Sequence, residues 1–70
     1  RRGKLYLRFD REDTPWLQRV KNLFTLFPGE NQAVLYFADT KRRLGTKCLL
    51  HEALIQELEA LLGKENVVVK

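Results

Sequence analysis

Methionine is absent from this 70-residue chain, and cysteine and histidine each occur only once. Because the sequence lacks a start residue, we interpret residues 1–70 as a single domain cut from a longer protein. The lone cysteine, Cys48, cannot form an internal disulfide, which indicates a reducing, cytoplasmic setting. One histidine (His51) and one cysteine are too few for a typical transition-metal site. We therefore expect no metal and no other cofactor.

Long apolar runs are also absent, because no stretch approaches the ~20 residues that span a bilayer. We expect no membrane partner. The nine acidic residues are outnumbered by thirteen basic ones, which gives a net charge of +4. That balance permits contact with nucleic acid or with an acidic protein surface, and requires neither. So short a chain builds one thin core with little room for a deep pocket, so we expect no small-molecule substrate.

The spacing of apolar residues predicts six elements. Leu5, Leu7 and Phe9 alternate with polar residues, as in a half-buried strand, whereas the two helical segments repeat their apolar residues every three or four positions. The predicted order is strand 4–9, helix 15–27, strand 32–38, strand 42–46, helix 52–62 and strand 66–69. Short connections favour an α+β domain of two layers with βαββαβ order. The simplest such fold is the ferredoxin-like, split βαβ arrangement, in which two helices lie on one face of a mostly antiparallel sheet.

The stretch "LFPGENQAVLYF" joins the first helix to the second strand. We interpret Pro28 and Gly29 as a corner, in which Pro28 ends the helix and Gly29 adopts a positive φ. Glu30 and Asn31 are interpreted as exposed residues without a structural role. Gly63 is placed to end the second helix.

Strand alternation divides the apolar residues between a core and a second face of the sheet. The core is predicted to contain Leu7, Phe24, Leu35, Phe37, Leu58 and Val68. Two helices cover only one face, so the other face is open to solvent or to a partner. The candidate partner-binding residues on it are Tyr6, Arg8, Val34 and Tyr36. Tyrosine is favourable in such a patch because a rigid ring buries area at low entropic cost.

A second candidate surface is the densest basic run. It consists of Lys41, Arg42, Arg43 and Lys47, and we favour a solvated hairpin over a contact with phosphate or with an acidic partner. No catalytic grouping accompanies it, because the carboxylates are scattered and the glycines match no phosphate-binding spacing. We interpret Cys48 as an inert thiol and His51 as a capping or surface residue.

Three pieces of the sequence, taken in order, resemble the C-terminal domain of the bacterial replicative DNA polymerase III alpha subunit. They are the strand "KLYLRF", the corner and strand "FPGENQAVLYF", and the helix and strand "LIQELEALLGKENVVV". The resemblance covers nearly the whole chain. It departs from the family at Phe27, where the family often has histidine, and it is least close between Thr40 and Leu50.

The resemblance implies a non-catalytic tail of a DNA-directed DNA polymerase, a nucleotidyltransferase that acts in bacterial DNA replication. In that family the polymerase aspartates, the phosphoesterase-like domain and the clamp-binding motif all lie upstream. The C-terminal region, with its oligonucleotide-binding-fold domain, is associated with the tau subunit of the clamp loader. The resemblance therefore implies a protein-protein interaction domain with tau as partner, and DNA contact through the parent protein.

Two other hypotheses come from the residues themselves. The open sheet face, with its tyrosines near Arg8 and Arg43, is compatible with a nucleic-acid-binding module in which rings stack on bases. The aromatic signature typical of RNA-recognition domains is missing from the third strand, which reads "RRLGT". The other hypothesis is a small-molecule-sensing regulatory domain, whose usual glycine-rich loop is replaced here by an acidic loop at residues 10–13.

Overall fold

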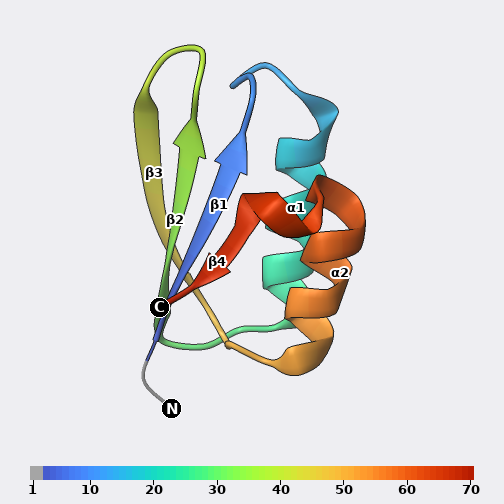
Figure 1. Ribbon diagram of the computed structural model, residues 1–70. Coiled ribbons are helices and arrows are strands. Elements are labelled where there is room, and N and C mark those ends of the chain that lie inside the picture. The colour runs from blue at the N-terminus through green and yellow to red at the C-terminus, as the bar shows by residue number, and fades with distance from the viewer. Residues whose placement is uncertain (1–2) are drawn as a thin grey trace.

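The computed structural model describes residues 3–70 and contains one four-stranded sheet with both helices on one side of it (Figure 1). The elements are β1 (Lys4–Phe9), α1 (Pro15–Leu26), β2 (Asn31–Phe37), β3 (Arg42–Cys48), α2 (Glu52–Leu62), a 3-10 turn η1 (Lys64–Asn66) and β4 (Val67–Val69). The predicted α+β class, the βαββαβ order and the two-layer architecture are confirmed. Neither α1 nor α2 has both the length and the apolar character needed to cross a membrane.

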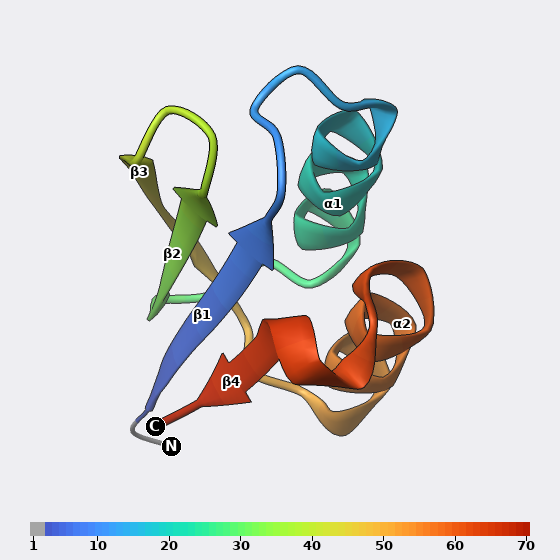
Figure 2. The same cartoon turned by 45° about the horizontal axis from the view of Figure 1, so that its top comes forward.

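The strand order in the sheet is β3-β2-β1-β4, which differs from the ferredoxin-like prediction. β1 and β2 are direct neighbours and run parallel. At one edge of the sheet β3 pairs antiparallel with β2, and at the other edge β4 pairs antiparallel with β1. The βαβ unit is therefore not split by a third strand. Figure 2 shows the parallel pair in the middle of the sheet, with α1 and α2 together on the right of it.

The polarity of β3 explains this difference. In a split βαβ unit β3 would occupy the middle of the sheet, where one of its faces would have to pack under the helices. Six of its seven residues are exposed, and only Cys48 is buried. A strand with so little apolar surface is stable at an edge, while the more apolar β1 and β2 take the centre.

The core lies between the sheet and the helices. It is formed by Leu5, Leu7, Phe9, Val20, Phe24, Ala33, Leu35, Phe37, Cys48, Leu50, Leu54, Leu58 and Val67. Five of the six residues predicted for the core are among them. The prediction that Val68 lies in the core is wrong, because its exposed fraction is 41% whereas that of Val67 is 8%. β4 pairs Val68 with Tyr6 and Val67 with Leu7, and residues that pair directly share a face of the sheet.

Local interactions explain where the helices begin and end. Thr14 caps α1 by accepting a hydrogen bond from the backbone N–H of Trp16, and Pro15 occupies the first turn. His51 caps α2, since its Nδ1 accepts a bond of 3.0 Å from the N–H of Ala53, as the capping interpretation predicted. Gly63 ends α2 at a φ of 95°, a conformation that favours glycine.

The corner after α1 is made differently from the prediction. The only glycine among residues 3–70 with a positive φ is Gly63. Gly29 therefore does not adopt the positive φ that was predicted for it. A Cβ at Gly29 would lie 2.7 Å from the Cα of Leu49, so glycine is required by the close approach of another backbone. Asn31 is also structural, because its Oδ1 accepts a bond from the N–H of Leu50, and Glu30 forms an ion pair with Lys47.

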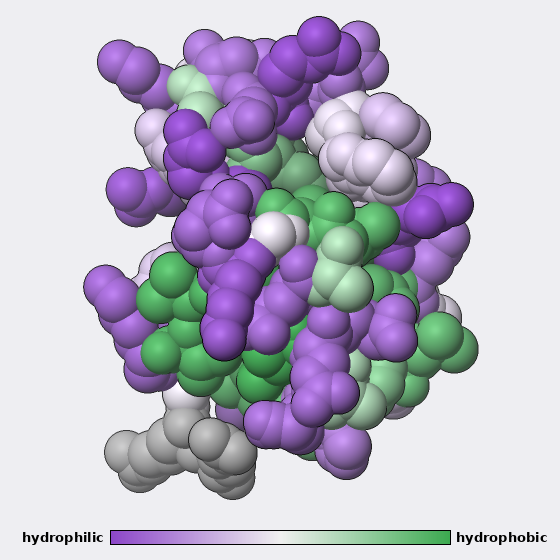
Figure 3. Space-filling model, turned by 45° about the vertical axis from the view of Figure 1, so that its right-hand side comes forward, coloured by the Kyte–Doolittle hydropathy of each residue, from purple (hydrophilic) through white to green (hydrophobic). Residues whose placement is uncertain are grey.

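Several large hydrophobic side chains remain at the surface, and Figure 3 shows hydrophobic patches between hydrophilic side chains on one side of the molecule. Trp16 begins the predicted apolar stripe of α1, yet it is 43% exposed, and the guanidinium of Arg19 lies 5.4 Å from its ring centroid. Leu44 in β3 is 39% exposed. The helix layer is therefore too narrow to cover every apolar residue on its side of the sheet.

Candidate functional site

The face of the sheet that points away from the helices is the candidate functional site, and it is called the open face below. Its residues follow from strand alternation and from the observed register. They are Lys4, Tyr6 and Arg8 on β1, Gln32, Val34 and Tyr36 on β2, Arg43, Gly45 and Lys47 on β3, and Val68 and Lys70 at β4. All four candidate partner-binding residues are therefore brought together on one surface.

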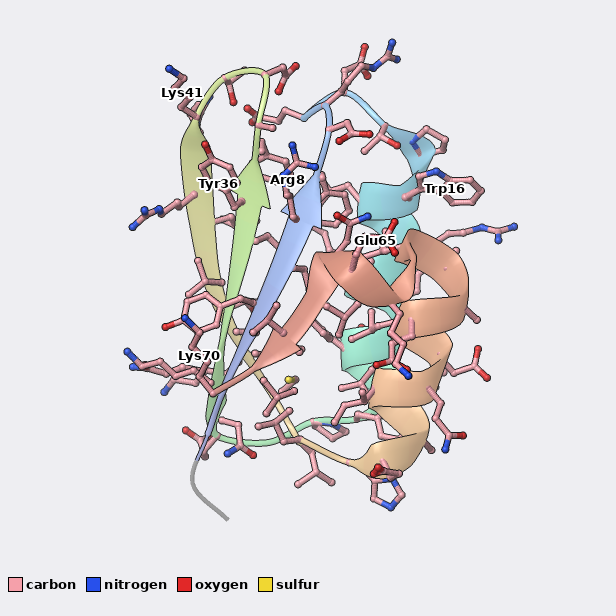
Figure 4. All side chains as sticks on the ribbon, in the orientation of Figure 1. Arg8, Trp16, Tyr36, Lys41, Glu65 and Lys70 are labelled. Carbon is pink, nitrogen blue, oxygen red and sulfur yellow. The ribbon has the colours of Figure 1, made fainter. Side chains whose placement is uncertain are left out.

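Two half-buried tyrosines form the aromatic part of the open face. Tyr6 lies beside Val34 and Val68 in the strand register, and Tyr36 lies beside Arg8. Figure 4 shows Tyr36, Arg8 and Lys70 on the side of the sheet away from the helices. The rings stand on the two central strands, so their positions are set by the backbone hydrogen bonds of the parallel pair.

An open hollow of about 580 Å³ lies between these rings. It is lined by Lys4, Tyr6, Val34, Tyr36, Arg43 and Gly45. Gly45 is the direct neighbour of Val34, and a Cβ built on it would meet nothing within 4 Å. The missing side chain on β3 therefore enlarges the hollow and leaves the methyl groups of Val34 accessible.

The charge of the open face has one sign. It carries five cations, of which Lys4, Arg8, Arg43 and Lys47 lie on the strands and Lys70 directly follows β4, and no acidic side chain. Neighbouring loops supply two ion pairs, Arg8 with Asp10 at 2.8 Å and Lys47 with Glu30 at 3.1 Å. Both pairs are exposed and contribute little to stability. The cations surround the apolar hollow, so the surface favours a ligand that is apolar or aromatic at its centre and anionic around it.

Three of these cations have no carboxylate partner within residues 3–70: Lys4, Arg43 and Lys70. The ammonium of Lys70 lies 5.8 Å from the ring centroid of Tyr6, a cation–π distance. Lys4 and Lys70 also exchange two backbone hydrogen bonds, of 2.8 and 2.9 Å, which hold both side chains at the same end of the face. Their charges remain available to a ligand.

The structure divides the predicted basic run between the two sides of the sheet. Arg43 and Lys47 lie on the open face, but Arg42 pairs with Phe37 on the helix side and lies 3.6 Å from Glu12. Lys41 lies in the turn at the tip of the β2–β3 hairpin, at a φ of 59° (Figure 4). The four residues therefore do not form one patch, because successive side chains of a strand point to opposite faces.

The candidate reactive groups are held in structural positions. Cys48 is fully buried, and burial raises the pKa of its thiol, which keeps it in the unreactive protonated form. His51 is engaged in capping α2. Within residues 3–70, no group of three or more histidine, cysteine or acidic side chains is placed to hold a metal ion. The arrangement on the open face is suited to binding and contains no evident nucleophile–base pair.

Five residues of the open face are not among the candidate residues of the sequence analysis: Lys4, Gln32, Gly45, Val68 and Lys70. Gln32 follows from the alternation of β2. Lys4 follows from the alternation of β1 and was recognisable. Gly45 and Val68 depend on the register of β3 and β4, which the sequence does not specify. Lys70 follows β4 and joins the face only through its backbone bonds to Lys4.

Comparison of the chain with protein-family models, with curated proteins and with solved structures finds no match.

Proposed function

We propose that this chain is a non-catalytic interaction domain at the C-terminus of a DNA polymerase III alpha subunit, and that its open face binds a protein partner in the cytoplasm. The proposed partner is the tau subunit of the clamp loader, as the sequence resemblance implies. The observation that supports a binding role is the hollow between Tyr6 and Tyr36, which the two helices leave uncovered. Tyrosine rings and arginine are the groups that most often contribute interface energy.

A second candidate function is binding of single-stranded nucleic acid on the same face. The observation that favours it is the set of five cations on the open face, without an acidic side chain among them. Tyrosine rings can stack on bases, and the cations can neutralise phosphates. The two proposals differ in salt dependence, because phosphate contacts release counterions and weaken steeply as salt is added.

The test is a pair of titrations with the double variant Tyr6→Ala, Tyr36→Ala. The purified tau subunit and a labelled single-stranded oligonucleotide are each titrated against the chain at low and at moderate salt. We expect tau binding that falls only gently as salt is added and that weakens by roughly 1–2 kcal/mol for each tyrosine removed. Trp16→Ala is the matched control, since Trp16 is an exposed aromatic residue outside the open face.

The second proposal would replace the first if the chain binds the oligonucleotide tightly and does not bind tau. In that case oligonucleotide binding should weaken steeply as salt is added and should be lost in the double variant. If the chain binds neither probe, both are wrong.

A further inference from the structure

The outer edge of β3 is a second surface, which borders the open face. Within residues 3–70, β3 pairs with β2 and with no other strand, so one side of its backbone faces outward along all seven residues, Arg42–Cys48. The opposite edge is much shorter, because β4 has three residues. An exposed strand edge presents unpaired N–H and C=O groups, which can pair with another extended chain.

A groove runs along the helix side of this edge. It has a volume of about 350 Å³ and lies between α1 and β3. Its lining residues from these two elements are Lys21, Phe24 and Thr25 of α1 and Leu44, Gly45, Thr46 and Lys47 of β3. Leu44 pairs with the buried Leu35 and is itself 39% exposed. A further strand would lie about 4.8 Å beyond β3, so its inward side chains would enter this groove and cover Leu44.

The charges around the edge favour an acidic occupant. β3 contains three cations and no carboxylate: Arg43 has no ion-pair partner within residues 3–70, while Arg42 and Lys47 form exposed ion pairs with Glu12 and Glu30. Lys21 adds a further cation that lines the groove from α1. Basic side chains on an edge strand also prevent edge-to-edge aggregation. A second copy of the chain would bring these cations against their own equivalents, so charge repulsion disfavours a homodimer through β3.

We propose that the edge of β3 binds an extended segment of another protein in which apolar and acidic residues alternate. Residues that pair across strands share a face. The partner's apolar side chains would therefore lie opposite Leu44 and Thr46 in the groove, and its carboxylates opposite Arg43 and Lys47 on the other side. A nucleic-acid strand has neither the backbone groups to extend the sheet nor the apolar side chains to fill the groove. This inference concerns the edge of β3, which shares Arg43 and Lys47 with the open face, whereas Leu44 and Thr46 lie on the helix side and outside the open face.

The test uses a synthetic capped peptide, acetyl-DVEIEVD-amide, which is as long as β3 and, offset from it by one residue, places its apolar side chains opposite Leu44 and Thr46 and its carboxylates opposite Arg43 and Lys47. Its binding to the 70-residue chain is measured by isothermal titration, and the protection of individual amides by hydrogen exchange. We expect binding, together with protection of β3 amides that exchange rapidly in the free chain. The peptide acetyl-VIVDEED-amide has the same composition without alternation, and we expect it to bind at least about tenfold more weakly.

Two variants separate the contributions of the groove and the charges. Leu44→Asp places a carboxylate in the groove, and Arg43→Glu with Lys47→Glu reverses the charges on the other side. Each is expected to weaken peptide binding by about tenfold or more. The matched controls lie at the opposite edge of the molecule: Val69→Asp, whose parent residue is 40% exposed, and Lys64→Glu. Thermal melts verify that each variant is folded.

The proposal is supported if the alternating peptide binds and the β3 variants lose that binding while the controls keep it. It is overturned if the alternating peptide does not bind at millimolar concentration, or if both peptides bind equally. It is also overturned if the control variants lose as much affinity as the β3 variants. Dimerisation of the free chain that Leu44→Asp abolishes, seen by sedimentation, would assign the edge to a second copy instead.

Discussion

The two faces of the sheet are built from the same strands and differ in nearly every property. On the covered face, Leu5, Leu7 and Phe9 of β1 are 0%, 1% and 3% exposed. On the open face, the alternating residues of the same strand are Lys4, Tyr6 and Arg8, which are exposed or half-buried. One step along the strand changes a residue from part of the core to part of a binding surface. Stability and binding can therefore be altered separately in this domain.

The largest expected effect is on the covered face. Leu7→Ala should lower the free energy of unfolding by about 2–5 kcal/mol, because it removes buried methyl groups and leaves a cavity in a small core. Arg8→Ala, one residue away on the open face, should change it by less than about 0.5 kcal/mol. Urea unfolding of both variants measures the difference. Equal losses would show that the two faces are not energetically distinct.

Two glycines provide a second comparison, because a side chain added at Gly29 would collide with a neighbouring segment and one added at Gly45 would not. Gly29→Ala would put a Cβ within 2.9 Å of three atoms of Leu49, two of them backbone atoms, so we expect a loss of about 1–3 kcal/mol. Gly45→Ala meets no atom within 4 Å and should be neutral or stabilise the strand by about 0.5–1 kcal/mol. Chemical denaturation tests both changes. A destabilising Gly45→Ala would indicate that the hollow on the open face is smaller than described.

The smallest expected effect is a pH dependence that originates on the covered face. Burial raises the pKa of the Cys48 thiol in the folded chain, so the unfolded chain loses this proton at a lower pH than the folded chain does. Stability should therefore fall as the pH rises above about 8.5, the ordinary thiol pKa. In Cys48→Ala this decrease should be smaller. If unfolding curves of the two proteins show the same slope with pH, the thiol does not contribute.

Much of the fold was predictable because its signals are local. The alternation in β1 and β2 and the capping residue His51 are each encoded within a few residues, and each is confirmed. The placement of Tyr6 and Tyr36 on one face follows from the same alternation. The corner at Gly29 was recognised, but its reason was wrong, because the contact with Leu49 joins segments that are distant in the sequence.

The sequence by itself determined the class of the domain, the order of its elements and which residues of β1 and β2 face the core. These follow from the period of the apolar residues and from local capping chemistry. Only the tertiary structure decided the strand order, the division of the basic run and the face taken by each valine of β4. Three consecutive valines contain no polar alternation, so their orientation comes from pairing Leu5 with Val69. In the same way β3 became an edge because the helices could cover only the more apolar strands beside it, which left both its groove and its cations accessible.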